Sequence, residues 1–232
     1  MGSHVGVYLG GYVAWEVGTD NETRDDSYAV QVAPASHWPE MRAAILVSRI
    51  RRKVSAALPG CKLQLRLIRY SRDAESIVPL RMGLMKKAIL ERDFDTFAEL
   101  TMKDSNSFHA VCLDTAPPIF YLNDVSRNII AVVEELNRVV GRKVAAYTFD
   151  AGPNAVVYYE EKMEGVVLGA LKGAGLVEVD GLQGKIVEGR TPEGLSEKLG
   201  GVLAQGVSRV ILAGVGEGPV SVETHLVHPD SR

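Results

Sequence analysis

The sequence is short of cysteine and has no long apolar run, and each shortage excludes a class of protein. Its 232 residues contain two cysteines, Cys61 and Cys112, which are too few for a disulfide scaffold. We therefore expect a reducing compartment and a cytosolic (cytoplasmic) location. No second ligand shares a metal-type spacing with Cys112, so we predict no metal site and place this cysteine in the core. No stretch approaches the roughly 20 apolar residues that a membrane-spanning helix needs.

Acidic and basic residues are nearly balanced over the chain as a whole. The formal net charge is −3 at pH 7, which gives no general case for a nucleic acid or a membrane as partner. Residues 48–72 are the exception, because they hold eight basic residues and no acidic one. Taken alone, this run is typical either of a polyphosphate or nucleic-acid site or of a solvated basic loop.

Apolar periodicity predicts the secondary structure. Hydrophobic residues make up 46% of the chain, which is ample for a core in one or two domains. Strands are predicted at 29–32, 42–47, 143–149, 155–159 and 207–213, and a strand or the start of a helix at 10–16. Helices are predicted from about Pro79 to Phe94, over 94–113, from Asn123 or Asp124 to Gly141, at 165–176, and from Thr191 or Pro192 to about Gly200. The connections do not form repeated βαβ units, so the predicted fold class is α+β, with an antiparallel sheet covered by helices.

Asp150 lies between two of the predicted strands and is the first candidate for chemistry. Ala-Gly-Pro follows it, and a Gly-Pro pair ends a strand and turns the chain. A carboxylate at the mouth of such a connection can act as a general base. The alternative is a turn aspartate that hydrogen-bonds its own loop.

Polar residues also gather on neighbouring turns of the predicted helix 94–113. They are Asp104, Ser105, Asn106 and His109. A lone histidine on such a helix is usually a satisfied buried or surface group, so we assign His109 no acid or base role.

Several motifs, in order along the chain, resemble those of one family. Tyr147–Ala155 reads Tyr-Thr-Phe-Asp-Ala-Gly-Pro-Asn-Ala, which is similar to the signature of the diphosphomevalonate (mevalonate diphosphate) decarboxylase family of the GHMP kinase superfamily. The other matching stretches are 10–16, 31–34, 36–39, 101–106, 108–110, 112–114, 117–119 and 209–212. The resemblance runs from about Gly10 to about Pro219 and covers only the C-terminal part of that family.

The resemblance implies a domain organisation and a reaction. It places a GHMP kinase C-terminal-type domain at 41–220, after the end of the N-terminal-domain region or a linker at 1–40 and before a tail at 221–232. The implied reaction is the ATP-dependent decarboxylation of mevalonate 5-diphosphate to isopentenyl diphosphate, in isoprenoid and sterol biosynthesis. Asp150 matches the family's catalytic aspartate. Substrate contacts are expected from Ser55, Ser105, Asn106, Gly152 and Asn154. The resemblance also implies a homodimer, and ATP and Mg²⁺ sites mainly in an N-terminal half that the chain does not match.

The sequence departs from the family at positions that matter for activity. The family's catalytic arginine falls at Gly6, and its substrate-loop Ser-Thr pair falls at Ala56 and Ala57. We therefore predict that the polypeptide as written has no decarboxylase activity. A non-catalytic remnant or a dimerising partner derived from this family is the alternative. A related small-molecule kinase is disfavoured, because those enzymes generally carry a more glycine-rich motif in place of Asp-Ala-Gly-Pro.

The family resemblance suggests a third interpretation of the basic run. The family carries a serine- and threonine-rich substrate loop at this point. Plausible codons for 48–53, 55–62 and 63–67, all read in one shifted frame, encode segments similar to that loop. We therefore hypothesise that this run is translated in the wrong reading frame, and we assign it no binding role.

Overall fold

The computed structural model describes residues 9–16, 18, 27–49, 69–176, 192–195, 199–204 and 206–220. Ser55 and most of the basic run lie outside these ranges, as does the predicted tail from residue 221 on. The chain divides into two compact units. One comprises Met1–His37 with Val215–Arg232, and the other comprises Trp38–Gly214.

The first unit contains a two-stranded antiparallel sheet. Strand β1 (Tyr12–Glu16) pairs with β2 (Tyr28–Ala33), and the short 3-10 helix η2 (Ala35–His37) follows. The strand alternative at 10–16 and the strand at 29–32 are thereby confirmed. Gly11 precedes β1 with a φ of +79°, and its N–H donates to the carbonyl of Gly216 at 2.7 Å. This bond joins the two sequence segments that make up the unit.

The second unit is built on a four-stranded sheet in which all neighbouring strands are antiparallel. Its strands are β3 (Met41–Ser48), β4 (Ala146–Phe149), β5 (Ala155–Glu160) and β6 (Val207–Gly214). Their order is β4-β5-β3-β6, so β4 lies at an edge of the sheet. All four strands were predicted, because each carries a short apolar run between turn residues.

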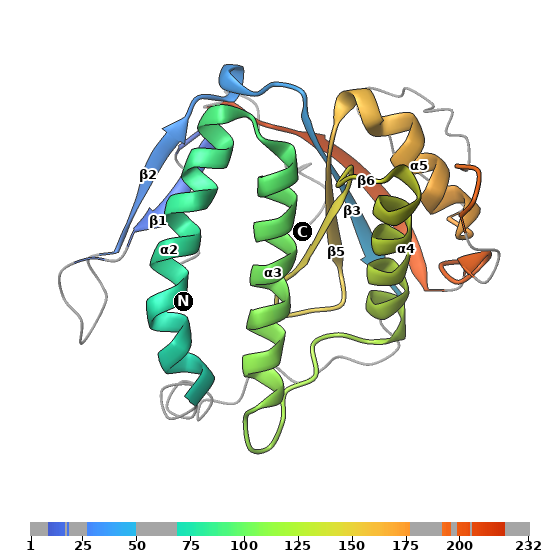
Figure 1. The fold of residues 1–232 in the computed structure, drawn as a ribbon, viewed down its shortest axis with the longest axis horizontal. Coiled ribbons are helices and arrows are strands. Elements are labelled where there is room, and N and C mark those ends of the chain that lie inside the picture. The colour runs from blue at the N-terminus through green and yellow to red at the C-terminus, as the bar shows by residue number, and fades with distance from the viewer. Residues whose placement is uncertain are drawn as a thin grey trace, which may run out of the picture. The chain divides into compact units, whose positions relative to one another are not determined.

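Four helices accompany this sheet, and three of them contact it. They are α2 (Arg69–Glu91), α3 (Phe94–Leu113), α4 (Asp124–Val140) and α5 (Glu164–Gly173), and the 3-10 helix η3 (Glu161–Met163) precedes the last. Helix α3 contacts β4 and β5, α4 contacts β4, and α5 contacts β5. The long helices α2 and α3 lie side by side and antiparallel (Figure 1). The α+β class, with an antiparallel sheet covered by helices, is confirmed.

The helix ends follow local sequence signals. Asn123 caps α4 through a capping box with Ser126, and Gly141 ends this helix with a φ of 79°, both as predicted. Between α2 and α3 the chain turns at Arg92, which adopts a φ of 55°. Asp93 then accepts hydrogen bonds from the N–H and hydroxyl of Thr96, at 3.1 and 2.6 Å, and so caps α3.

Two helix predictions are wrong. The prediction that a helix begins near Pro79 fails, because α2 begins at Arg69 and continues through the proline. Proline removes one backbone hydrogen bond, but α2 packs along α3, and this contact stabilises a longer helix than the local signal indicates. The helix predicted from Thr191 or Pro192 is also absent at 192–195, where the chain forms a turn.

Aromatic side chains join α3 to the sheet. Trp38 is 1% exposed and meets Phe97 edge-on at a ring separation of 5.9 Å. Phe97 in turn meets Tyr158 of β5 edge-on at 5.5 Å. Edge-to-face pairs of this kind add to the free energy gained from apolar burial. Cys112 is buried as predicted, with 4% of its surface exposed.

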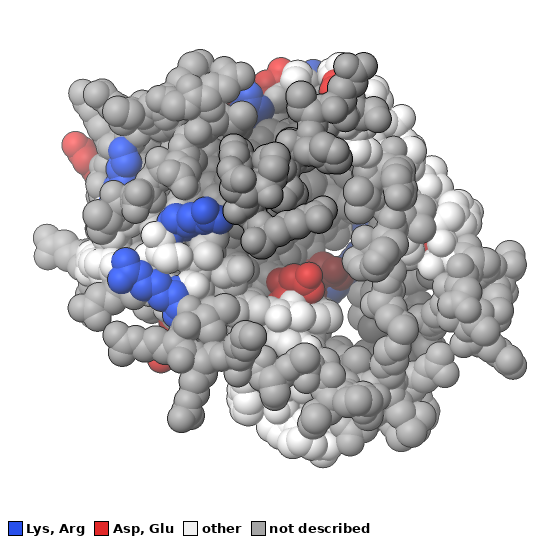
Figure 2. Space-filling view, turned by 180° about the vertical axis from the view of Figure 1, so that it is seen from behind, with Lys and Arg blue, Asp and Glu red and all other residues white. Residues whose placement is uncertain are grey.

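Surface charge among the described residues does not form one continuous patch in the view from behind. Figure 2 shows described basic and acidic side chains separated by uncharged and undescribed surface. Within the same part of the chain, no helix is both long enough and apolar enough to cross a membrane.

Candidate active site

Asp150 lies directly after β4, where the chain turns toward β5. Its side chain is exposed and makes no hydrogen bond or ion pair with the described residues. The N–H of Gly152 donates to the Asp150 carbonyl at 2.7 Å and closes a tight turn. A Cβ atom placed on Gly152 would meet no atom within 4 Å, so the space beside this turn is open. The carboxylate is therefore accessible to a ligand.

The far end of the Asp150 turn is tied to two other elements. The Ser126 hydroxyl, at the start of α4, donates to the carbonyl of Pro153 at 3.3 Å. The backbone N–H of Ser48, the last residue of β3, donates to Oδ1 of Asn154 at 2.9 Å. Ser126 is fully buried. The loop is thus held by neighbouring elements and is not a freely moving turn.

The near end of the turn is tied to α3. The backbone N–H of Phe149 donates to Oγ of Ser105 at 3.1 Å. His109 lies one helical turn further along α3, with its ring 6.2 Å from that of Phe149. Both α3 side chains are buried, with 5% and 6% of their surface exposed. Helix α3 therefore meets the residue that immediately precedes Asp150.

His109 is enclosed by aromatic rings. Phe108 and Tyr121 lie 5.0 and 6.3 Å from it, ring centre to ring centre. Burial lowers the pKa of His109 below its ordinary value of 6.5, although the Phe149 backbone and the charge of Asp150 act in the opposite direction. The ring is therefore neutral at pH 7. Its Nε2 atom is buried and has no hydrogen-bond partner among the described residues.

Tyr147 connects the middle of β4 to two helices. Its hydroxyl lies 3.1 Å from Nδ2 of Asn106 on α3 and 3.4 Å from a carboxylate oxygen of Glu134 on α4. Burial raises the pKa of Tyr147, and the nearby charge of Glu134 acts in the same direction. The phenol therefore stays neutral and braces the strand that ends at Asp150.

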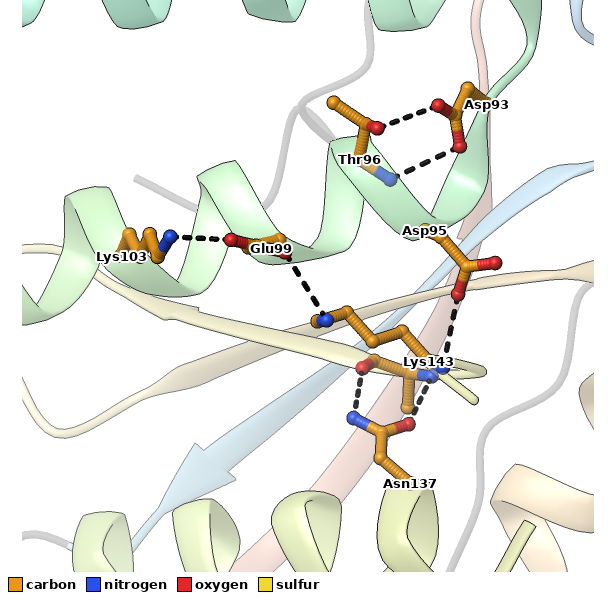
Figure 3. A network of polar contacts seen from close by, with 8 residues as sticks. Asp93, Asp95, Thr96, Glu99, Lys103, Asn137 and Lys143 are labelled. Atoms are coloured by element: carbon orange, nitrogen blue, oxygen red, sulfur yellow. Dashed lines mark hydrogen bonds and ion pairs between the residues drawn. The ribbon is translucent and has the colours of Figure 1, made fainter. Parts of the chain in front are cut away.

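A polar network secures the start of β4 in the same way (Figure 3). Asn137 of α4 uses its side chain to bond the N–H groups of Val144 and Ala145 and the carbonyl of Ala145. Asp95 accepts a hydrogen bond from the backbone N–H of Lys143 at 3.0 Å. Both ends of this short edge strand are thereby fixed by side chains from α3 and α4.

Glu99 of α3 joins the same network through its carboxylate. Lys103 and Lys143 both form ion pairs with it. Hydrogen bonds from Lys103 and then Lys143 lower the pKa of Glu99. This carboxylate is committed to structural contacts, in contrast to that of Asp150.

The structure gathers most of the predicted site residues around one loop, but it places them differently. Ser105 is buried against the Phe149 backbone, whereas Asn106 is exposed and bonded to Tyr147. Gly152 borders open space, and the exposed Asn154 is bonded to Ser48. Contact between these residues and a substrate stays a prediction. Ser55 lies outside the described residues.

The sequence did not indicate the contacts made by Ser126, Ser48 and Tyr147. Each depends on which elements become neighbours in space, and that is not a property of local sequence. One available signal was the four-residue spacing of Ser105 and His109, which places both side chains on one face of α3.

Metal ligands are not clustered in the described part of the chain. No group of three or more histidine, cysteine, aspartate or glutamate side chains there could hold a metal ion. Asp150 therefore belongs to no such group of three or more potential ligands among the described residues.

The fold and the site together define a class of protein. An antiparallel sheet covered by helices matches the C-terminal fold shared by mevalonate diphosphate decarboxylase and the GHMP kinases. A sequence model of the mevalonate 5-diphosphate decarboxylase C-terminal domain matches residues 45–222. The chain belongs to this decarboxylase family.

Individual relatives agree with this assignment. The chain is 50% identical to the diphosphomevalonate decarboxylase of Aspergillus fumigatus, over 94% of this chain and 56% of the relative. It is 43% identical to the human diphosphomevalonate decarboxylase, over 95% of this chain and 57% of the relative. The chain thus spans little more than half the length of the curated relatives it matches.

Solved structures show the same likeness. A crystal structure of mevalonate 5-diphosphate decarboxylase superposes with a TM-score of 0.79 at 38% identity, covering 97% of this chain and 59% of that one. The mevalonate diphosphate decarboxylase of Trypanosoma brucei gives a TM-score of 0.73 at 25% identity, covering 91% and 58%. The resemblance to the decarboxylase family is confirmed.

Proposed function

We propose that this chain supplies the catalytic aspartate, Asp150, for the ATP-dependent decarboxylation of mevalonate 5-diphosphate. The balanced reaction converts mevalonate 5-diphosphate and ATP to isopentenyl diphosphate, ADP, phosphate and carbon dioxide. The observation that supports this proposal is the exposed Asp150 carboxylate, which makes no bond among the described residues, on a loop tied to α3, α4 and β3. Membership of the decarboxylase family supplies the choice of substrate.

In this proposal Asp150 acts on the tertiary hydroxyl of the substrate. A tertiary alcohol is both a poor nucleophile and a poor leaving group. Asp150 orients the hydroxyl and accepts its proton while the oxygen takes the γ-phosphoryl group of ATP. Phosphate then leaves, and the carbon–carbon bond to the carboxylate breaks, so that its electron pair forms the new double bond as carbon dioxide departs. Gly152 and Asn154 are proposed to line the same site.

The sites for ATP and Mg²⁺ are proposed to lie mainly in the part of the family sequence that this chain does not match. ATP carries several negative charges, and Mg²⁺ and cationic side chains must offset them during phosphoryl transfer. We propose in consequence that the polypeptide as written does not complete the reaction by itself.

Fusion of the chain to a relative's N-terminal part tests this proposal. The N-terminal part of the Aspergillus fumigatus enzyme is joined ahead of residue 10, and that enzyme's own sequence replaces residues 50–68. The fusion is expected to release carbon dioxide from mevalonate 5-diphosphate with ATP, and the chain alone is expected to release none. Asp150→Asn should lower the rate by on the order of 10²–10⁴-fold, the range of general base catalysis.

Asp104→Asn is the matched control, because Asp104 is an exposed aspartate of the same unit that pairs with Arg81 on α2. It should leave the rate of the fusion unchanged. An inactive fusion, or an active one that tolerates Asp150→Asn, would refute the proposed role. Release of carbon dioxide by the unfused chain would instead refute the claim that it is inactive alone.

Two properties implied by the family also remain proposals for this chain. One is a homodimer and the other is a cytosolic location. Sedimentation of the purified chain at two concentrations tests the first, and cell fractionation tests the second.

A further inference from the structure

We propose that Ser105 and His109 are positioning residues that hold the backbone of Phe149 and thereby aim the carboxylate of Asp150. This inference rests on the proposed function of Asp150 and adds the residues that orient it. Neither α3 side chain is proposed to touch the reacting atoms.

The position of β4 at the edge of the sheet explains why such a clamp is needed. An edge strand has one row of N–H and C=O groups without a partner strand, and these groups must find other partners when they are covered. The N–H of Phe149 belongs to this row, since it bonds to Ser105 of α3 at 3.1 Å. The N–H and C=O of one residue point to the same side of an antiparallel strand. The carbonyl of Phe149 therefore also faces α3.

The spacing of Ser105 and His109 along α3 suits the N–H and the carbonyl of Phe149. Ser105 and His109 are four residues apart, so their side chains leave the same face of the helix. Both are buried, and the His109 ring lies against Phe149 with an interplanar angle of 77°. A serine hydroxyl suits a backbone N–H, and a neutral imidazole N–H suits a backbone carbonyl.

The chemistry of His109 argues against a purely space-filling role. Its Nε2 atom is buried without a partner in the described part of the chain. A buried polar atom that lacks a hydrogen bond destabilises the folded state, and a phenylalanine ring would occupy much the same volume without that cost. In this proposal the other ring nitrogen donates to the Phe149 carbonyl, next to which the His109 ring lies, and that would give this position a reason to hold a histidine.

The clamp acts on catalysis because Asp150 is the next residue. A shift of about 1 Å in a catalytic group, caused by a substitution far from the reacting atoms, can lower a rate by about 10²-fold. The Asp150 side chain makes no bond of its own with described residues, so its position depends on the backbone that carries it. Because Phe149 directly precedes Asp150, contacts from α3 that hold the Phe149 backbone also restrict the position of the Asp150 carboxylate.

The first test measures the bond in this chain itself by NMR amide exchange. In Ser105→Ala the Phe149 amide should exchange about tenfold faster than in the wild type, since a typical net hydrogen bond corresponds to about one factor of ten. Ser107→Ala is the matched control, because Ser107 lies on α3 and bonds to the Lys103 carbonyl and Arg81. Equal exchange in Ser105→Ala and the wild type would overturn the clamp.

The second test measures catalysis in the active fusion. Ser105→Ala and His109→Phe should each lower kcat by about tenfold or more. An unchanged KM for mevalonate 5-diphosphate would separate this positioning role from the substrate contact predicted for Ser105. An active fusion in which both variants keep the kcat of Ser107→Ala would overturn the inference. An inactive wild-type fusion would count against the proposed function, and the exchange measurement would still decide the clamp.

Discussion

The carboxamide Oδ1 of Asn154 accepts a hydrogen bond from the backbone N–H of Ser48 at 2.9 Å, although 106 positions separate the two residues in sequence. This bond joins the end of β3 to the end of the loop that carries Asp150. Ser48 begins the region in which the family carries its substrate loop. The bond therefore connects that region to the loop of the proposed catalytic residue, Asp150.

Asn154→Ala should destabilise the chain by about 1 kcal/mol, the net value of one typical hydrogen bond. The Ser48 N–H then loses its partner at the end of β3. Urea unfolding followed by circular dichroism measures the difference. Asn154→Asp keeps an acceptor oxygen at this position and should retain most of the stability. Equal losses in the two variants would contradict the assigned bond.

Asn137→Ala should cost more, about 3 kcal/mol, because it leaves several buried groups without partners. The Asn137 side chain bonds the N–H of Val144, the N–H of Ala145 and the carbonyl of Ala145. Asn128→Ala serves as the control, since that amide makes a single bond, to the Val202 carbonyl at 3.3 Å. Urea midpoints should rank the wild type first, Asn128→Ala second and Asn137→Ala last. A reversed order of the two variants would refute the role of Asn137.

Arg92→Gly should stabilise the chain by about 1 kcal/mol. Arg92 ends α2 with a φ of 55°, a conformation that is unfavourable for residues with a side chain and that glycine adopts without strain. Arg92→Ala keeps the strain and should not stabilise. Thermal unfolding of both variants checks this. A lower melting temperature for Arg92→Gly than for Arg92→Ala would show that the backbone strain is not the dominant effect.

His109 should make the stability of the chain depend on pH. Its folded-state pKa lies below the ordinary 6.5, so the unfolded chain binds this proton more readily than the folded chain does. Its contribution is therefore complete above about pH 6.5 and is lost as the pH falls toward the folded-state pKa.

Urea unfolding at about pH 7.5 and about pH 5.5 tests this dependence. Acidification should destabilise the wild type more than His109→Gln, which cannot take up the proton. Equal losses in the two proteins would show that another group governs the pH dependence.

Local sequence was sufficient for much of the fold. Asn123 and Gly141 marked the ends of α4, because capping bonds and positive φ angles depend on neighbouring residues in the chain. The strands around Asp150 were predicted from their apolar runs, and the turn from Ala-Gly-Pro. Pro79 misled the prediction, because the contact between α2 and α3 outweighs a single lost hydrogen bond within α2.

The candidate site was predictable only in part. Asp150 was identified from its own motif, because a strand–loop–strand connection is visible in the sequence. The roles of Ser105 and Ser126 were not, since a serine gives no sign of which distant backbone group its hydroxyl will meet. The structure shows Ser105 bonded to Phe149, and its contact with substrate stays a prediction.

The sequence by itself therefore determined the strands, the ends of α4, the family and the position of Asp150, because each depends on short-range patterns. Tertiary structure alone decided that β4 is an edge strand and that α3 covers it. It also decided which polar side chains meet the exposed backbone groups of β4, because unpaired N–H and C=O groups at a covered edge bind whatever donors and acceptors the packed helices bring to them.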